Sequence, residues 1–310
     1  MPAKATRDAF GEALASLGDR FPDIVAMDAD LAKSTKSEMF AKKFPQRFFE
    51  FGIAEANMIG TAAGLALAGK IPFACSFACF ISSRFDQIRI SVAYSQANVR
   101  LVGSHAGIAI GEDGYSQQGL EDLALIRSLP GMTIIQPADD LETAGAVEYL
   151  CTHKGPAYLR TTRQKVERVN GQGYRFQVGK PVELRPVGKD AVIFCSGGEV
   201  FYSLKAAQSL EQEGLDVGVI NVHTIKPLDA GAIVLAASRT RAVATAEDHQ
   251  IIGGLGSAVA EALAEAGLNR RLLRIGIKDQ FGESGSPEEL LAKHKMDAAG
   301  IAEQLRALLR

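Results

Sequence analysis

Glu55 is the first residue whose type and position could do chemistry. It lies in FGIAEANMIGTAAGLALAG, at the start of a predicted apolar helix, with Ile53, Ala54 and Met58 around it. A carboxylate is favoured at a helix start by the free backbone amides and the helix dipole. A carboxylate in apolar surroundings can also share a proton with a ligand nitrogen. The residues alone leave both interpretations open.

Two aromatic residues follow in PFACSFACF, where Phe77 and Phe80 are three positions apart at the end of a predicted strand. Core packing is the ordinary role of such a pair. The functional alternative is a flat platform for a heteroaromatic ring.

A long polar loop follows the strand NVRLVGS and reads HAGIAIGEDGYSQQG. It carries His105, Asp113 and Gln117. Ordered loops of this length are uncommon unless they are functional. His105 fits a structural histidine and a substrate contact equally well. Arg7, Asp30, Ser34 and Arg163 are far apart in the sequence, and only a fold could bring them to this loop.

These residues need a scaffold, and alternating apolar runs and helical patterns supply one. The pattern predicts parallel sheets covered by helices, with ligands at the carboxyl ends of the strands. The first predicted strands are DIVAMDAD, KIPFACSF, NVRLVGS, MTIIQP and PAYLRT, with helices at 84–94 and 120–127. A second series comprises the strands DAVIFCSG, VGVINV, AVATAED and LLRIGIKD, with helices at 200–213, after Pro227 and at 256–266.

The predicted fold is therefore α/β with two domains. Residues 1–165 form the first domain, the polar, Gly-rich stretch 166–188 is a linker, and residues 189–310 form a smaller second domain. A length of 310 residues agrees with two domains by the usual size of a single core.

Composition excludes several classes of protein. Hydrophobic residues make up 47% and charged residues 23%, which is typical of a globular protein. A net charge of −2 gives no broad basic field for a nucleic acid or a membrane surface. No export signal or membrane span is visible, so we expect a cytoplasmic protein. Four cysteines lie in apolar segments without zinc-site spacing and are predicted to be buried, reduced thiols.

The quoted segments, in this order, resemble the pyrimidine-binding region of transketolases from about Lys4 to Arg163. The rest of the chain is similar to the C-terminal domain of that family. The resemblance implies the α/β fold of thiamine diphosphate enzymes, with a pyrimidine-binding domain followed by the smaller C-terminal domain.

The resemblance assigns cofactor contacts to three residues. In transketolases the glutamate of the FGI-x-E motif meets the pyrimidine nitrogen of thiamine diphosphate, and here that glutamate is Glu55. Its shared proton would favour the tautomer of the aminopyrimidine that deprotonates the thiazolium carbon. Phe77 and Phe80 match the aromatic residues that stack on the ring.

The resemblance also assigns contacts to a sugar phosphate. The matching positions are Arg7, Asp30, Ser34, His105, Asp113 and Arg163. Arginine forks suit a phosphate dianion. Gln117 stands where many members have His and others Gln. We expect it to hydrogen-bond the substrate, and a role in proton transfer stays open.

A metal motif of the family is missing. Thiamine enzymes hold the diphosphate through Mg²⁺ or Ca²⁺ with a GDG motif and a later Asn, and no GDG occurs here. The chain is thus expected to have no metal ligands and to pair with a separate N-terminal subunit that carries them, as an α₂β₂ heterotetramer. Alone it should be nearly inactive. The small face of Gly60, Ala63, Gly64 and Ala68 would suit either the subunit interface or internal packing.

The implied activity is transfer of a two-carbon ketol unit between sugar phosphates, as in the pentose phosphate pathway. Alternatives are the beta subunit of a 2-oxo acid dehydrogenase, a deoxyxylulose phosphate synthase-like enzyme and a non-catalytic scaffold subunit. Arg7, Ser34, His105 and Arg163 favour transketolase over the dehydrogenase. A branched or sulfonated sugar is a further option for the substrate.

Overall fold

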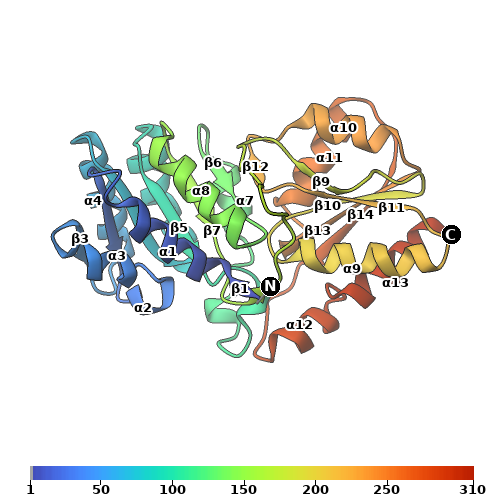
Figure 1. Cartoon of the computed structure of the whole chain (residues 1–310), viewed down its shortest axis with the longest axis horizontal. Coiled ribbons are helices and arrows are strands. Elements are labelled where there is room, and N and C mark those ends of the chain that lie inside the picture. Colours follow the sequence, from blue (N-terminus) through green and yellow to red (C-terminus); the bar gives the residue numbers. More distant parts are fainter. Residues whose placement is uncertain (1–2) are drawn as a thin grey trace.

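Two α/β units lie side by side in the computed structural model, which describes residues 3–310 (Figure 1). The first unit contains a seven-stranded sheet in the order β12-β6-β7-β5-β4-β2-β3. Its parallel strands are β2 (Ile24–Asp28), β3 (Phe48–Glu50), β4 (Ile71–Phe77), β5 (Arg100–Ser104), β6 (Thr133–Ile135) and β7 (Ala157–Arg160). Apart from β3, each coincides with a predicted apolar run.

The second unit contains a five-stranded sheet in the order β14-β13-β10-β11-β9. Its parallel strands are β10 (Ala191–Cys195), β11 (Val217–Asn221), β13 (Ala242–Gln250) and β14 (Arg271–Ile277). These four were predicted, because buried parallel strands are continuously apolar. The α/β class with parallel-rich sheets is therefore confirmed.

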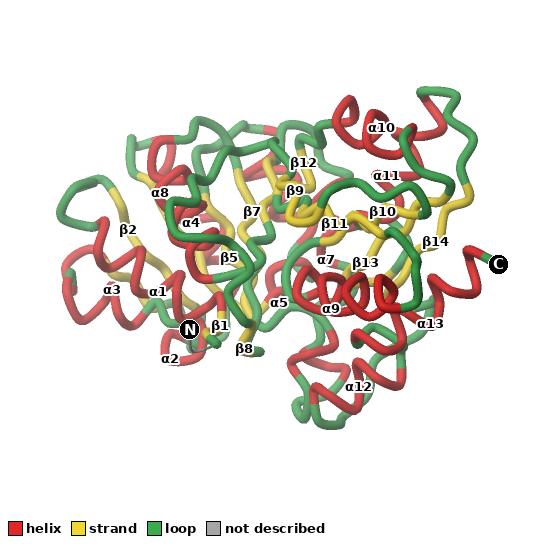
Figure 2. The backbone as a smooth tube through the Cα atoms, turned by 45° about the vertical axis from the view of Figure 1, so that its right-hand side comes forward, coloured by secondary structure: helices red, strands yellow, loops and turns green. Residues whose placement is uncertain are grey.

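Two edge strands were not predicted, and both are antiparallel. β9 (Val182–Arg185) comes from the stretch expected to be a linker and pairs with β11. β12 (Thr224–Lys226) belongs in sequence to the second unit but pairs with β6 of the first sheet. The second unit thus supplies an edge strand to the first sheet, and Figures 1 and 2 show β12 between the strands of the two units. A short antiparallel pair joins β1 (Lys4–Ala5) to β8 (Lys165–Val166).

Helices cover both sheets. The first unit has α1 (Thr6–Leu17), α2 (Ala32–Thr35), α3 (Glu38–Lys43), α4 (Glu55–Leu67), α5 (Ala78–Ser82), α6 (Phe85–Gln87), α7 (Asp122–Arg127) and α8 (Asp140–Thr152). A π-helix, Ile88–Tyr94, occupies most of the predicted helix at 84–94. The second unit has α9 (Glu199–Gln212), α10 (Ala230–Ser238), α11 (Leu255–Glu265), α12 (Pro287–Lys293) and α13 (Ala298–Leu309). No helix within residues 3–310 has the length and apolar character to cross a membrane.

The apolar core is continuous across the two units. One buried cluster contains Leu123 and Ile126 of α7 together with Ile233 of α10 and Val259 of α11. A second cluster on the other face of the second sheet includes Ile108, from the long loop of the first unit. All four cysteines are free and buried, as expected. The two units therefore share a hydrophobic interface.

Candidate active site

Most of the predicted site residues lie at the ends of strands of the first sheet or in the loops and helices that follow them, and Arg7 lies in α1. Glu55 begins α4 and is only 4% exposed. The turn before it contains Gly52, whose φ is +64°. One oxygen of Glu50 accepts hydrogen bonds from the backbone amides of Asp30 (2.7 Å), Phe51 (3.0 Å) and Gly52 (3.0 Å). Glu50 thus fixes the chain that leads into Glu55.

A chain of hydrogen bonds connects Glu55 to the other polar groups. The Ser76 hydroxyl donates to Glu55 over 3.4 Å, and the Ser104 hydroxyl donates to the backbone carbonyl of Ser76, also over 3.4 Å. The ring Nδ1 of His105 lies 2.9 Å from the Ser104 hydroxyl oxygen. Arg7 Nη1 donates to His105 Nε2 over 2.6 Å. The chain runs from the carboxylate of α4 to the guanidinium of α1.

His105 is neutral in this arrangement. Because Arg7 donates to Nε2, that nitrogen is an acceptor and the ring proton is on Nδ1. Burial, together with the charges of Arg7, Arg163 and Lys36, lowers the pKa of His105 to about 3. Its backbone has φ of +54°, a region that residues other than glycine rarely adopt. Such strain is concentrated at functional sites.

The rings of Phe77 and Phe80 stack on each other, but only one of the two has accessible surface. The Phe77 and Phe80 rings are 5.5 Å apart at an interplanar angle of 7°. The His105 ring lies 3.8 Å from the Phe77 ring. Phe77 is therefore contacted by both rings and is 4% exposed, while Phe80 is half-buried. The accessible aromatic surface belongs to Phe80.

The two arginines lie near the His105 loop. Arg7 also donates to the backbone carbonyl of Ser34 over 3.1 Å. Burial lowers the pKa of Arg7, and nearby Arg163 lowers it further. Arg163 donates to Asp113 over 3.4 Å and is 39% exposed. Arg7 Nε is buried without a hydrogen-bond partner among residues 3–310.

The turn that carries Asp30 and Ser34 is shaped by Asp28, which was not among the predicted residues. Its carboxylate accepts hydrogen bonds from the Leu31 amide (2.7 Å) and from the hydroxyls of Thr35 (2.6 Å) and Ser37 (2.8 Å). Burial raises the pKa of Asp28 to about 6. Asp30 is exposed and has a φ of +63°.

Gln117 lies farther along the same loop, at the end of a 3₁₀ turn. Its side chain is half-buried, and its backbone carbonyl accepts a hydrogen bond from the Cys79 thiol over 3.2 Å. Cys79 lies in α5 beside Phe80. The loop and the aromatic pair are therefore joined at this point.

This chemistry fits the pyrimidine end of thiamine diphosphate. The buried carboxylate of Glu55 has acceptor capacity left after its long bond to Ser76. The half-exposed ring of Phe80 offers a stacking surface. Residues 3–310 contain no cluster of three or more His, Cys, Asp or Glu side chains that could hold a metal ion.

Comparison with known proteins decides the family. Residues 3–168 match the family model described as "Transketolase, pyrimidine binding domain", and residues 179–301 match "Transketolase, C-terminal domain". The chain belongs to the transketolase family. The family expected from the sequence is thus confirmed.

Individual transketolase relatives match over nearly the whole chain. A "Putative transketolase C-terminal section" from Methanocaldococcus jannaschii is 45% identical, covering 97% of this chain and 95% of that protein. A solved structure titled "Split gene transketolase, inactive beta4 tetramer" is 42% identical with a TM-score of 0.89, covering 99% of both chains. Human transketolase is 40% identical over 98% of this chain, which spans about half of that longer protein.

Ser76, Ser104, Asp28 and Glu50 are the polar residues that sequence reasoning missed. Each lies within or at the end of a strand and bonds to predicted site residues or to the turns that carry them. The sequence signal that could have identified them was a polar residue at the carboxyl end of a predicted parallel strand.

Proposed function

We propose that the chain is the C-terminal subunit of a thiamine diphosphate-dependent transketolase in the cytoplasm. It would act with a separate N-terminal subunit that holds the diphosphate and Mg²⁺, and it would transfer a two-carbon ketol unit between sugar phosphates. The observation that carries the proposal is the hydrogen-bond chain from Glu55 to Arg7. It connects a carboxylate suited to the pyrimidine nitrogen of the cofactor with a guanidinium suited to a phosphate.

Each end of that chain has its own task. Glu55, sheltered from water, would hold a proton at the pyrimidine nitrogen, and Phe80 would stack on the ring. The bound cofactor supplies the carbon nucleophile that attacks the ketose carbonyl. Neutral His105 would contact a substrate hydroxyl through Nε2 once a bound phosphate draws Arg7 away from that nitrogen, while Nδ1 stays bonded to Ser104.

The phosphate end of the substrate would lie at Arg7 and Arg163. Arg7 Nε is an unpaired donor, and the 3.4 Å contact of Arg163 with Asp113 is long enough for a phosphate to replace. Asp30, Ser34 and Asp113 would contact hydroxyl groups of the sugar. Gln117 would hydrogen-bond the substrate.

A separate partner subunit is supported by the surface of the first unit. The outer side of α4 exposes Leu67 (75%), Gly64 and Ala68, and Ile53 just before it is 84% exposed. Ala63, grouped with that face in the sequence, is buried in the core. The adjacent π-helix exposes Tyr94 at 84%. Exposed apolar surface of this kind is typical of a protein interface, and an α₂β₂ heterotetramer would cover it.

A sulfonated sugar is a second candidate substrate. A "6-deoxy-6-sulfo-D-fructose transketolase subunit" from Clostridium sp. is 41% identical, covering 95% of this chain and 91% of that protein. A sulfonate would find the same arginine donors but carries one negative charge where a phosphate carries up to two.

Reconstitution tests the proposal. The chain is mixed with an N-terminal transketolase subunit, thiamine diphosphate and Mg²⁺, and ketol transfer from xylulose 5-phosphate to ribose 5-phosphate is measured. We expect transfer by the mixture and almost none by either chain alone. Failure with these sugars but transfer from 6-deoxy-6-sulfofructose would select the second candidate. Failure with both would refute the proposal.

A further inference from the structure

The loop that carries three predicted substrate residues is held by the second unit. Residues 105–118 contain short 3₁₀ turns at Ile108–Ile110 and Tyr115–Gln117 and no longer element. Ile108 is completely buried in a cluster with Leu290 of α12 and with Ile275 and Ile277 of β14. The loop therefore relies on the C-terminal domain for part of its core.

Three glycines allow the loop to lie against that domain. Gly107, Gly111 and Gly114 have φ of +87°, +85° and +76°. A β-carbon on Gly107 would lie 1.9 Å from Asp248 Oδ2, and one on Gly114 would lie 2.4 Å from Ser284 Oγ. A β-carbon at either position would force its neighbour to move, at Gly107 the hydrogen-bonded Asp248 carboxylate, and the positive φ of all three residues favours glycine.

Asp248 makes the most direct polar contact with the loop. Its carboxylate accepts hydrogen bonds from the backbone amides of Ile108 (2.7 Å) and Ala109 (3.3 Å), and it is 4% exposed. Its backbone carbonyl accepts a hydrogen bond from Arg160 Nη2 of the first unit over 3.0 Å. A buried carboxylate with two amide donors is a strong, directional anchor.

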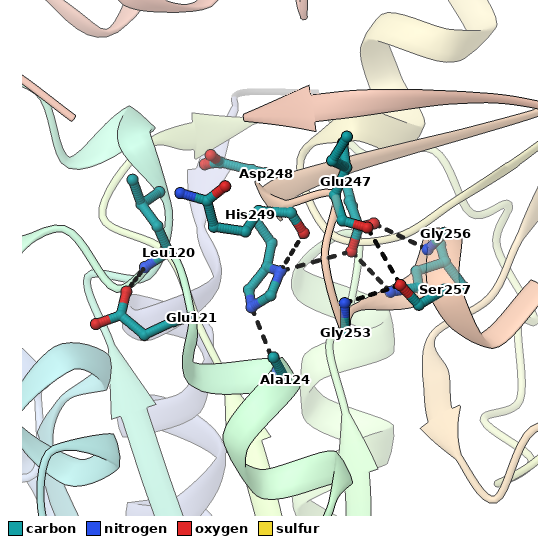
Figure 3. Close-up of polar contacts among 12 residues, drawn as sticks. Leu120, Glu121, Ala124, Glu247, Asp248, His249, Gly253, Gly256 and Ser257 are labelled. Carbon is teal, nitrogen blue, oxygen red and sulfur yellow. Dashed lines mark hydrogen bonds and ion pairs between the residues drawn. The ribbon is translucent and has the colours of Figure 1, made fainter. Parts of the chain in front are cut away.

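The residues on either side of Asp248 fix its strand. Glu247 accepts from the amides of Leu255 (2.7 Å) and Gly256 (2.8 Å) at the start of α11. His249 Nδ1 donates to the Gln250 carbonyl over 2.6 Å, while Nε2 accepts from the Ala124 amide over 3.4 Å. Figure 3 shows Asp248 pointing away from both of these side chains, as alternation along a strand requires.

The far end of the loop is tied to the same strand. The Gln250 amide donates to the Leu120 carbonyl over 2.8 Å. The Gln118 side chain donates to the backbone carbonyl of Glu283 over 2.9 Å. The loop is thus fastened at Ile108 and at Leu120, and the span between these anchors carries Asp113 and Gln117.

We infer that Asp248 is a positioning residue for ketol transfer: it is the C-terminal domain's anchor for the substrate loop 105–118. The inference rests on the proposed function and gives the C-terminal domain a role in it. Asp248 is buried, and the hydrogen bonds of its carboxylate are to the loop backbone. It acts through the backbone of Ile108 and Ala109, which lie three and four positions after His105.

Two substitutions at Asp248 and one control test the inference. Asp248→Ala removes both acceptors, and Asp248→Asn keeps one. The control, Leu305→Ala, empties a fully buried position of α13 that belongs to the same apolar cluster as Ile108 but makes no hydrogen bond to the loop. Hydrogen exchange of peptides covering 106–111 is measured on the full chain. Substrate KM, turnover and cofactor affinity are measured on the complex with the N-terminal subunit.

We expect Asp248→Ala to speed exchange of the Ile108 and Ala109 amides by about tenfold or more, since hydrogen bonds to a charged acceptor are lost. KM for the sugar phosphate should rise about tenfold, because small misplacements of contact residues are costly. Asp248→Asn should be intermediate, and cofactor affinity should not change. Leu305→Ala should lower the melting temperature while leaving KM and the exchange of these two amides as in the wild type.

If the Ile108 and Ala109 amides exchanged at the wild-type rate in Asp248→Ala, Asp248 would not anchor the loop. Faster exchange with unchanged KM and turnover would overturn the positioning role, as would a KM increase of equal size in Leu305→Ala. An inactive wild-type complex would instead refute the proposed function and the catalytic part of the inference with it. The exchange measurement would still decide whether Asp248 holds the loop.

Discussion

The carboxyl ends of the two parallel sheets differ in whether their polar side chains have already used their hydrogen-bonding capacity. At the first sheet, His105 has a left-handed backbone, Arg7 Nε is unpaired and Phe80 is half-exposed. At the second sheet, the carboxylates of Glu247 and Asp248 each accept two backbone amides and are closed off from solvent. The first edge has capacity left for a ligand, whereas the carboxylates of the second bind the protein's own backbone, Glu247 at the start of α11 and Asp248 at the loop of the first unit.

The comparison shows why a charged strand end is not by itself a binding site. Ligands gather at the carboxyl ends of parallel strands because loops and free amides meet there. In the second sheet those positions meet the protein's own backbone. Polar residues at strand ends therefore form a candidate ligand site in the first unit and, in the second, part of the contact between the two units, the joint.

The largest effect expected at the open edge comes from Glu55→Gln. The amide keeps the shape of the side chain but cannot hold the proton, so turnover of the reconstituted complex should fall by about 10²–10⁴-fold. Ser76→Ala, which removes one 3.4 Å hydrogen bond to Glu55, serves as the control and should have a small effect. Steady-state kinetics with thermal melting checks this pair. Full turnover in Glu55→Gln would contradict the assigned role.

The strongest test at the joint is Asp122→Asn, because Asp122 holds Arg160, which donates to the Asp248 carbonyl of the second unit. Asp122 and Arg160 are both fully buried and form a two-pronged pair at 2.8 and 3.0 Å. Burial raises the pKa of Asp122, but Arg160 outweighs it and the net pKa is lowered. The substitution leaves Arg160 charged and unpaired, which should reduce the free energy of unfolding by about 3–5 kcal/mol.

Urea unfolding measures this loss. Glu213→Gln, which breaks an exposed pair with Arg306, provides the control and should leave the unfolding midpoint unchanged. Equal midpoints for Asp122→Asn and the wild type would mean that the joint does not depend on this pair.

Arg7→Gln should affect binding more than chemistry. KM for a phosphorylated acceptor should rise about 10- to 100-fold because a charge-assisted donor is lost. KM for the corresponding sugar without phosphate should hardly change. Steady-state kinetics with the paired acceptors makes the comparison. An equal rise in KM for both acceptors would contradict binding of the substrate phosphate at Arg7.

The smallest expected effect is on the pH dependence of stability, and it is compared for His105 at the first edge and His249 at the second. Burial lowers the pKa of His105 to about 3 and that of His249 to about 4, below the value near 6.5 of an unfolded chain. The unfolded state then binds the extra proton, so each histidine's stabilisation is complete above pH 6.5. It is lost as the pH falls toward 3 for His105 and toward 4 for His249, by up to about 1.4 kcal/mol per pH unit.

His105→Gln and His249→Gln should therefore both flatten the fall of stability between pH 6.5 and 5, as followed by urea unfolding. In the reconstituted complex, His105→Gln alone should raise substrate KM. If His249→Gln raised KM as much, the distinction between the two edges would fail.

The sequence predicted the central parallel strands because they are buried on both faces and read as continuous apolar runs. It missed β9 and β12, which are short antiparallel edge strands; β9 pairs with β11 of its own sheet, whereas β12 pairs with β6 of the other unit. It also missed α12 and α13, although a capping box at Ser286 and Glu289 precedes the buried Leu290 and Leu291. That signal was readable but was not used.

For the site, the sequence indicated Glu55, the aromatic pair and the loop after β5. The structure places Arg7 against His105, 98 positions away. Sequence spacing could not supply this contact, because it depends on the packing of α1 beside the sheet. The anchor at Asp248 was hidden for the same reason, since its partners are about 140 positions earlier.

The central claim is that Glu55 activates the pyrimidine ring of thiamine diphosphate, and its most direct measurement is exchange of the cofactor's C2 hydrogen with deuterium. The measurement uses the complex of this chain with an N-terminal subunit and needs no sugar. The account predicts fast exchange in the wild type and exchange at least about 100-fold slower in Glu55→Gln, with cofactor affinity retained. Equal exchange rates in the two complexes would contradict it.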